Sequence, residues 1–281
     1  MEVKQGCLYV VGTPIGNLSD ISERAVETLK NVDFIAAEDT RVSGILLSRL
    51  GLKKKFTSCH AHNIVSKSGE IIKRLKSGDS CAVVTDAGMP CISDPGEFLV
   101  RLCGENDIPV YVVPGACALT AALAVSGLDT RRFSFEGFLS VVKKQRTTHL
   151  ESLKNSPYTL IFYEAPHKLR NTLADLRTFL GDRRIAVCRE LTKLYEEVLR
   201  GRISDMIALY EEKSPKGEYV LVVASEETDF AESATDLKQA SKSALELHHS
   251  GMGLSEAAKT VSAQTGLKKS DIYRETAKII K

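Results

Sequence analysis

The chain lacks an apolar run long enough to cross a membrane, because its most apolar stretch, from Val110 to Val125, is interrupted by Pro114 and Gly115. Residues 1–6 carry no apolar segment ahead of the first predicted strand, so we expect no secretory signal. Charge of one sign does not dominate either, since 38 Lys and Arg stand against 36 Asp and Glu. This balance excludes a polycation of the histone type, and any contact with nucleic acid has to come from local basic patches.

Paired cysteines are also missing. The seven cysteines are odd in number, form no Cys-x-x-Cys pair, and mostly lie in apolar segments that are typical of strands. We therefore expect reduced thiols in the core and a cytoplasmic protein. The segment Cys59-His60-Ala61-His62 contains metal-ligating side chains, but no second ligand pair follows at a suitable spacing, so no metal site is predicted.

Several common cofactor and nucleophile signatures are absent. The turn from Gly12 to Gly16 matches neither the dinucleotide-binding glycine pattern nor a Walker A loop, so binding of NAD or ATP has no support from the sequence. The chain also lacks the Gly-x-Ser-x-Gly turn of serine hydrolases. Cys117 lies at a predicted helix start, but no partner histidine is identifiable, which favours a pocket-lining role over a nucleophile.

Three apolar runs that each end in a turn containing Gly and Pro are the most informative feature present. They are Leu8–Val11 before Gly12-Thr13-Pro14, Cys81–Thr85 before Asp86-Ala87-Gly88, and Val110–Val113 before Pro114-Gly115. Such runs are typical of buried parallel strands whose carboxyl ends open into loops. Ligands bind at this edge of an α/β sheet, where glycine lets the backbone approach them closely. The three turns predict one composite pocket.

A fourth strand end carries charge. Glu38-Asp39-Thr40-Arg41 follows the predicted strand Asp33–Ala37 and brings two acids, a hydroxyl and a guanidinium to the same sheet edge. Assembling these groups there is costly without a functional reason. A helix cap combined with a salt bridge is the alternative interpretation.

The periodicity of apolar residues divides the chain into three parts. Helical spacing at 19–30, 64–75 and 96–105 alternates with strands, which predicts a doubly wound parallel sheet. A helix at 116–126 opens a second α/β unit, for which we expect some antiparallel pairing because residues 133–138 alternate in facing. The remaining predicted elements of this unit are strands at 159–163, 184–188 and 219–223 and helices at 145–154, 167–180 and 204–212.

These patterns predict an α/β domain over residues 1–116, a second over 117–225, and a helical tail over 234–281. Residues 226–232 contain four acids and no base and are interpreted as a linker. The tail carries eight Lys and Arg against five Asp and Glu. Predicted helices at 255–264 and 271–280, with Ser255 and Ser270 as N-caps, give it a helix-turn-helix outline.

Six segments resemble, in order, the signature blocks of one known family. They are Val11–Leu18, Ala36–Arg41, Thr85–Gly96, Tyr163–Leu169, Arg189–Lys193 and Lys216–Glu218. Together with the tail, they are similar to the ribosomal RNA small subunit methyltransferase I family, which belongs to the tetrapyrrole methylase class of S-adenosylmethionine-dependent methyltransferases. The resemblance spans essentially the whole chain.

The resemblance implies two α/β domains of the tetrapyrrole methylase type, S-adenosylmethionine held folded in the cleft between them, and a homodimer. Two positions depart from the family pattern: Met89 stands where a small polar residue is common, and Ser140 stands where proline is usual. Both concern loop shape or cofactor contact. The residues that the resemblance places at the methyl-donor site are Pro14, Gly88, Ile92, Asp94, Cys117, Ala118, Tyr163, Leu191 and Gly217.

The resemblance further implies methylation of the ribose 2′-hydroxyl of a cytidine in the decoding region of 16S rRNA. We expect 16S rRNA within the 30S subunit as the partner, and recognition of naked rRNA stays open as the alternative. A ribose hydroxyl is a weak acid, so an enzyme base or hydrogen-bond acceptor should assist. We expect Asp39, Asp86 or Glu190 to orient the hydroxyl. Arg41 or Lys193 would hold the adjacent phosphate, because all five residues lie in blocks that face the same cleft.

Contacts with RNA are expected from four basic patches. The patches are Lys53-Lys54-Lys55, Arg131-Arg132, Lys143-Lys144 with Arg146, and Lys268-Lys269.

Two alternative functions stay open. One is a methylase that acts on a porphyrinoid, and the other is a non-catalytic RNA-binding assembly factor that kept the fold.

Overall fold

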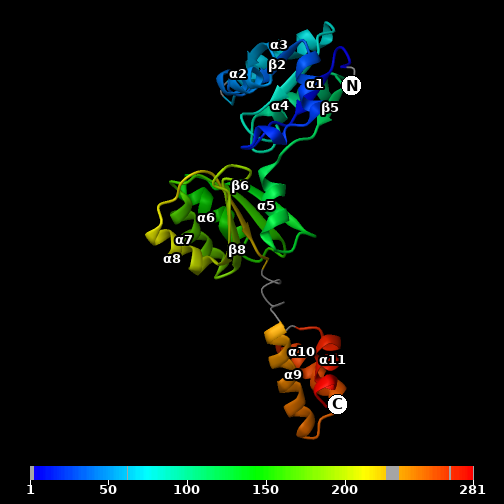
Figure 1. Cartoon of the computed structure of the whole chain (residues 1–281), viewed down its shortest axis with the longest axis vertical. Helices are drawn as coiled ribbons and strands as arrows, with labels where there is room; N and C mark the ends of the chain where they lie inside the picture. The colour runs from blue at the N-terminus through cyan, green and yellow to red at the C-terminus, as the bar shows by residue number, and fades with distance from the viewer. Residues whose placement is uncertain (1–2, 62, 226–233, 266, 281) are drawn as a thin grey trace.

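Two five-stranded sheets and a group of three helices make up the computed structural model, which describes residues 3–61, 63–225, 234–265 and 267–280 (Figure 1). The first sheet is parallel throughout and has the strand order β3-β2-β4-β1-β5. Its strands are β1 (Leu8–Val11), β2 (Phe34–Ala37), β3 (Lys55–Ser58), β4 (Cys81–Val84) and β5 (Val110–Val113). Its helices are η1 (Leu18–Asp20), α1 (Glu23–Asn31), α2 (Thr40–Arg49), α3 (Ile64–Lys76) and α4 (Gly96–Glu105).

Both faces of this sheet are buried, which confirms the doubly wound arrangement. Leu8 and Val10 pack with α3 and α4 on one face, whereas Tyr9 and Val11 pack with α1 and α2 on the other. The first helix begins later than predicted, because the Ser22 hydroxyl accepts a hydrogen bond from the Ala25 amide at 3.1 Å and caps α1 there. The residues before Ser22 form the short turn η1 instead.

The second sheet has the order β6-β7-β10-β8-β9 and is mixed. Its strands are β6 (Phe133–Phe138), β7 (Thr159–Glu164), β8 (Arg184–Arg189), β9 (Glu197–Arg202) and β10 (Tyr219–Val223). Helices α6 (Lys143–Ser152), α7 (Leu169–Leu180) and α8 (Ile203–Glu212) cover one face, and α5 (Ala118–Ser126) packs on the other. The chain is thus divided into two α/β units followed by helices.

Antiparallel pairing occurs in this sheet as expected. It was inferred from the alternation of residues 133–138, and that reason was wrong, because these residues form a parallel strand. Strand β10 runs antiparallel to β7 and β8, and β8 runs antiparallel to β9, whereas β6 pairs parallel with β7. The alternation of residues 133–138 is broken by a shift of register between Phe135 and Gly137. Gly137 adopts a φ of 63°, which is the backbone conformation of a bulge built on glycine.

The last three helices have a core of their own, built from small residues such as Ala244 and Ala258 around Val261 and Ile272. They are α9 (Ala234–His249), α10 (Leu254–Thr265) and α11 (Lys269–Ile280). The predicted N-caps were misplaced, because Ser255 and Ser270 lie inside the first turns of α10 and α11. The predicted linker at 226–232 lies outside the described residues. Among the described residues, no helix has both the length and the apolar character that crossing a membrane requires.

Candidate functional site

The carboxyl ends of β1, β4 and β5 meet in a closely packed group of loops. The amide of Thr13 donates to the carbonyl of Gly88 at 2.9 Å, and the amide of Gly88 donates back to the carbonyl of Thr13 at 3.2 Å. Glycine is required where the first and third loops cross, since a Cβ on Gly12 would lie 2.7 Å from the Cα of Gly115. The three Gly-Pro turns are therefore joined at one sheet edge, as the sequence predicted.

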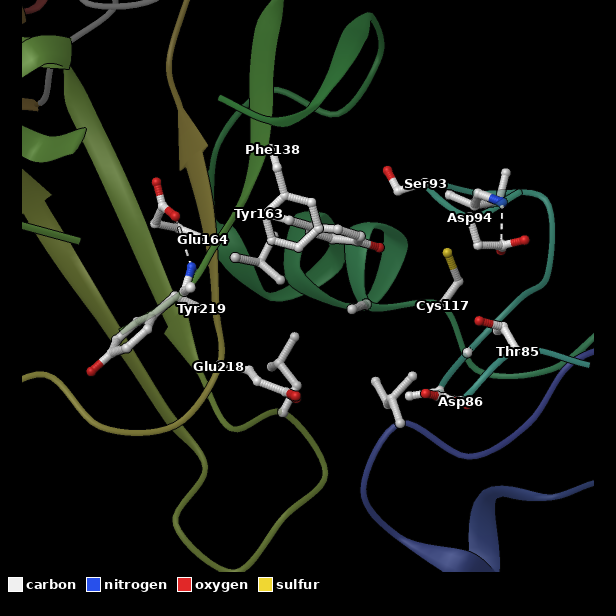
Figure 2. Close-up of a pocket in the computed structure, with 18 of the residues that line it drawn as sticks. Thr85, Asp86, Ser93, Asp94, Cys117, Phe138, Tyr163, Glu164, Glu218 and Tyr219 are labelled. Carbon is white, nitrogen blue, oxygen red and sulfur yellow. Dashed lines mark hydrogen bonds between the residues drawn. The ribbon is translucent and has the colours of Figure 1, made fainter. Parts of the chain in front are cut away.

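A cavity of about 630 Å³ lies between this edge and the second sheet. Its size falls within the range of small-molecule sites, roughly 300–1,000 Å³. Figure 2 shows the rings of Phe138 and Tyr163 together, with Ser93, Asp94 and Cys117 across the cavity from them. Further apolar side chains and carboxylates complete the lining, including Ile15, Glu38, Asp86, Ile92, Glu164, Leu191, Glu218 and Val220.

Two loops that border the cavity hold non-glycine residues in the left-handed backbone region. Four of the five described non-glycine residues with positive φ lie there: Cys91 (70°) and Ser93 (64°) after β4, and Glu190 (50°) and Thr192 (63°) after β8. Such conformations cost energy and persist only where the surrounding structure fixes them, which occurs often at ligand sites. In the first loop, the Asp94 carboxylate does so by accepting the amides of Ile92 at 3.3 Å and Gly96 at 2.8 Å.

The acidic block at the end of β2 meets the end of β4. Thr85 Oγ1 donates to Glu38 Oε2 at 2.8 Å, and the amide of Asp39 donates to Asp86 Oδ1 at 3.1 Å. Asp39 also accepts Arg41 Nη2 at 2.6 Å, and the hydrogen bonds from Arg41 lower the pKa of Asp39 to about 2. Burial raises the pKa of Asp86, and the negative charges of Glu38 and Asp39 raise it further, against the opposing effects of the Asp39 amide and Arg41. Of the two aspartates, Asp86 is thus the one that more readily takes up a proton.

Lys193 bridges two acids at the opposite wall. Its Nζ donates to Glu190 Oε1 at 2.9 Å and to Glu218 Oε2 at 2.8 Å. Burial opposes ionisation of Glu190 and Lys193, but the hydrogen bonds to these two side chains and the charges near them outweigh it. They lower the pKa of Glu190 and raise that of Lys193. The ammonium group is therefore already neutralised by protein carboxylates.

Tyr163 connects the second sheet to the start of α5. Its hydroxyl accepts the amide of Leu119 at 3.1 Å, which satisfies one of the unpaired donors at a helix N-terminus. Burial, together with the nearby Cys117 thiol, raises the pKa of Tyr163 far above its ordinary value. The phenol is a fixed neutral group in the wall of the cavity.

Most of the predicted cofactor residues line this cavity: Gly88, Ile92, Asp94, Cys117, Ala118, Tyr163 and Leu191. Pro14 and Gly217 do not, although their neighbours Ile15 and Glu218 do. Of the five predicted catalytic residues, the cavity is lined by Asp86 and Lys193. The other three do not line it. Asp39 is hydrogen-bonded to Asp86 and Glu190 to Lys193, and Arg41 is hydrogen-bonded to Asp39.

Sequence reasoning missed several lining residues. Glu164 and His167 lie in a block that was recognised, but no role was assigned to either. Glu164 is buried, and its carboxylate accepts the amide of Ala165 at 2.8 Å and the hydroxyl of Thr172. Phe138 was missed because residues 133–138 were interpreted as a regular strand; Gly137 inside that strand was the signal for the bulge that turns the ring toward Tyr163.

The seven cysteines are all free, and burial raises the pKa of Cys59, Cys103 and Cys188 to about 11. The described residues contain no cluster of three or more His, Cys, Asp or Glu side chains that could hold a metal ion.

Comparisons with known proteins agree with this architecture. The family model described as Tetrapyrrole (Corrin/Porphyrin) Methylases matches residues 7–207. The chain is 46% identical over 272 residues to a protein of Synechocystis named ribosomal RNA small subunit methyltransferase I, with 96% of each chain covered. It is 43% identical to the protein of that name from Haemophilus influenzae, over 96% of this chain and 95% of that one. The chain belongs to this family of tetrapyrrole methylases.

A shorter member of the ribosomal RNA small subunit methyltransferase I family comes from Thermotoga maritima. It is 46% identical over 222 residues, which cover 79% of this chain and 100% of that protein. About a fifth of the present chain therefore has no counterpart there.

Solved structures share the fold at low identity. A uroporphyrin-III-C-methyltransferase from Thermus thermophilus aligns with a TM-score of 0.56 and 20% identity, over 77% of this chain and 94% of that one. A diphthine synthase aligns with a TM-score of 0.59 and 15% identity, over 78% and 89%. The tetrapyrrole methylase fold of the chain is thus supported by both sequence and structure.

Proposed function

We propose that this chain transfers a methyl group from S-adenosylmethionine to the ribose 2′-hydroxyl of a cytidine in the decoding region of 16S rRNA. The observation that carries the proposal is the pair of long alignments, 46% and 43% identical, to proteins named for methylation of small-subunit rRNA. The cavity between the two sheets supplies the place for the reaction. The partner would be 16S rRNA within the 30S subunit, and the cytoplasm would be the location.

The chemistry of the lining suits this cofactor. S-adenosylmethionine supplies an electrophilic methyl group on a positively charged sulfur. Apolar side chains such as Ile15, Ile92 and Leu191 suit a base and an aliphatic chain, and the carboxylates Asp86 and Asp94 suit a positive charge and sugar hydroxyls. By the predicted assignment, Gly88, Ile92, Asp94, Cys117, Ala118, Tyr163 and Leu191 would hold the cofactor, with Pro14 and Gly217 shaping the loops beside it.

Asp86 is our candidate for the group that orients the ribose hydroxyl and accepts its proton. It lines the cavity, and its pKa is raised, which moves a carboxylate toward the strength of a useful base. The carboxylate of Asp39 already accepts hydrogen bonds from Arg41, and that of Glu190 accepts one from Lys193. Both residues would act by positioning their neighbours. Arg41, with its side chain 86% exposed, is better placed to meet a phosphate than Lys193, which is held between two acids.

Of the four basic patches, three are partly engaged within the protein. Arg131 pairs with Asp129 at 2.9 Å, and Arg132 donates to the hydroxyl of Tyr158. Arg146 pairs with Asp175 at 2.9 Å, and Lys54 donates to the carbonyl of Val32. Lys143, Lys144, Lys268 and Lys269 are exposed and form no ion pair with another described residue. These four lysines are our candidates for phosphate contacts, and α9 to α11 would add RNA affinity without taking part in the chemistry.

A transfer assay with tritiated S-adenosylmethionine tests the proposal. Purified chain is incubated with 30S subunits, deproteinised 16S rRNA or a uroporphyrinogen, and labelled RNA is then digested to nucleosides. We expect label in 30S subunits or 16S rRNA, recovered as 2′-O-methylcytidine. Label only in the porphyrinoid would support the alternative methylase. Cofactor binding without transfer to any acceptor would favour an assembly factor, and a base-methylated product would contradict the proposed 2′-hydroxyl.

A further inference from the structure

The carboxyl end of β6 places an aromatic ring at the mouth of the cavity by an irregular backbone. Phe138 pairs with Tyr163 across the parallel β6–β7 ladder, and Phe135 pairs with Ile161. Residues three apart lie on opposite faces of a regular strand. The bulge between Phe135 and Gly137 inserts one residue, so both rings contact Tyr163, with centroid distances of 4.8 and 5.5 Å.

Phe138 remains 55% exposed although it lines the cavity. Its neighbour Gly137 lies beside Ser93 of the first domain, since a Cβ there would be 3.4 Å from Ser93 Oγ. The ring is thus at the rim where the two domains meet (Figure 2). An exposed aromatic ring held on a rigid strand is a platform on which an unpaired base can stack.

The segment that follows continues the same exposed surface and adds positive charge. Val141 is 72% exposed and Val142 is 51% exposed. Lys143 and Lys144 come next in the chain, and both are exposed and form no ion pair within the described part of the chain. Ser140 fixes the turn between strand and helix, because its hydroxyl accepts the amide of Val142 at 3.1 Å and donates to Gln145 Oε1 at 2.8 Å.

We infer that Phe138, Val141, Val142, Lys143 and Lys144, here called the β6 rim, bind the unpaired RNA strand that enters the cavity. Phe138 stacks on a base of that strand, and the two lysines neutralise phosphates of the adjoining nucleotides. The inference rests on the proposed function for the identity of the polymer. It adds that the substrate segment is single-stranded at the point of entry, because a paired base presents no free face to the ring.

The charge of the rim favours RNA over a second copy of the chain as its occupant. Apolar side chains alone would suit another protein surface, but two adjacent unpaired lysines suit a polyanion. Continuity with the cavity points the same way, because Phe138 lines the same cavity as Asp86, the candidate base.

Binding measurements on the full chain test the rim without needing methyl transfer. We compare Phe138→Leu, which keeps an apolar side chain, with Phe138→Tyr, which keeps the ring. Phe133→Leu is the matched control, since Phe133 is 42% exposed at the other end of β6 and does not line the cavity. Affinity for 30S subunits is measured by filter binding, and affinity for S-adenosylmethionine by calorimetry.

We expect Phe138→Leu to weaken 30S binding by roughly 5- to 100-fold, the equivalent of losing one base stack. Phe138→Tyr and Phe133→Leu should bind 30S subunits as the wild type does, and cofactor affinity should stay unchanged in all three. Replacing both Lys143 and Lys144 with alanine should reduce the slope of log affinity against log salt by about 1.4, or roughly 0.7 per phosphate contact.

Three results would overturn the inference. One is unchanged 30S affinity in Phe138→Leu. A second is loss of cofactor affinity in that variant, which would assign the ring to the methyl donor. The third is a changed oligomeric state of the Phe138→Leu chain in sedimentation, which would make the rim an interface between copies. The 30S binding assay contains no cofactor and does not depend on methyl transfer. A wrong inference about the β6 rim can therefore be distinguished from a wrong proposed function, which would show as no methyl transfer by the wild-type chain.

Discussion

At the scale of single residues, two aspartates in the chain make the same local turn with different neighbours. Asp39 accepts the amide and guanidinium of Arg41, and Asp129 accepts those of Arg131 in the same way. In both cases hydrogen bonds from the arginine lower the aspartate pKa to about 2. The difference is that Asp39 also contacts Asp86, whose pKa the positive charge of Arg41 lowers.

Substituting Arg41 therefore has a predictable effect on the pH dependence of the reaction. If the ionised Asp86 carboxylate accepts the hydroxyl proton, activity falls as the pH drops through the Asp86 pKa. Arg41→Met removes a charge that holds this pKa down, so activity should be lost at a higher pH than in the wild type. Single-turnover rates at saturating cofactor, measured across the acid pH range, give the pH at which half of the activity is lost.

Arg131→Met is the control, because it breaks the equivalent turn away from Asp86 and should leave the midpoint where it is. An identical acid limb in Arg41→Met and wild type would show that Asp86 does not act as the base. Asp86→Asn should slow the reaction and abolish the fall in rate at low pH. A wild-type rate in that variant would mean that alignment of the hydroxyl is sufficient for methyl transfer without a base.

At the scale of elements, apolar patterning predicted the strands that are rich in apolar residues, and it missed two polar strands at sheet edges. The limits of β5, β10 and α4 agree with the sequence, because each is an apolar or amphipathic run bounded by turn residues. Strands β3 and β9 were missed, since both are edge strands rich in polar residues such as Lys55 and Arg200. The bulge in β6 has one local signal, Gly137 inside the strand, but this glycine was interpreted as part of a regular strand, so Phe138 was not placed in the site beforehand.

The crossing of the loops after β1 and β5 depends on the absence of side chains at Gly12 and Gly115. Gly12→Ala would put a methyl group 2.7 Å from backbone atoms of Gly115, which can move only by shifting β5 or its loop. We expect a loss of about 1–3 kcal/mol in the free energy of unfolding, as for other overpacked sites. Urea unfolding followed by circular dichroism measures it.

Gly69→Ala is the matched control in the exposed interior of α3, where a Cβ would meet nothing within 4 Å. It should raise the free energy of unfolding by about 0.5–1 kcal/mol, because alanine loses less backbone freedom than glycine in a helix. Equal stability of the two variants would contradict the close approach of the two loops.

At the scale of the whole molecule, the chain combines two α/β units with a group of three helices that has its own core. The core of α9 to α11 is built from their own residues, and a relative from Thermotoga maritima is complete without about a fifth of this chain. The α11 helix exposes Lys269, Arg274 and Lys278, although the latter two pair with acids on the same helix. On the proposed function, α9 to α11 would have an accessory role in RNA binding.

Truncation after Glu227 should separate binding from cofactor recognition. The shortened chain should bind S-adenosylmethionine as tightly as the full chain, because no residue that lines the cavity is removed. Its affinity for 30S subunits should fall, and the dependence of that affinity on salt should become less steep, as fewer phosphates are neutralised. An unchanged salt slope would exclude a role for the helical group in RNA binding.

The claim on which the whole account depends is that the cavity between the two sheets holds S-adenosylmethionine. Calorimetric titration of the full chain tests it most directly, in parallel with Ala118→Trp, which fills the cavity, and Ala263→Trp, which alters an exposed position on α10. We predict one bound cofactor per chain for the wild type and Ala263→Trp, and loss of binding in Ala118→Trp. No heat from the wild type, or undiminished binding by Ala118→Trp, would contradict the account.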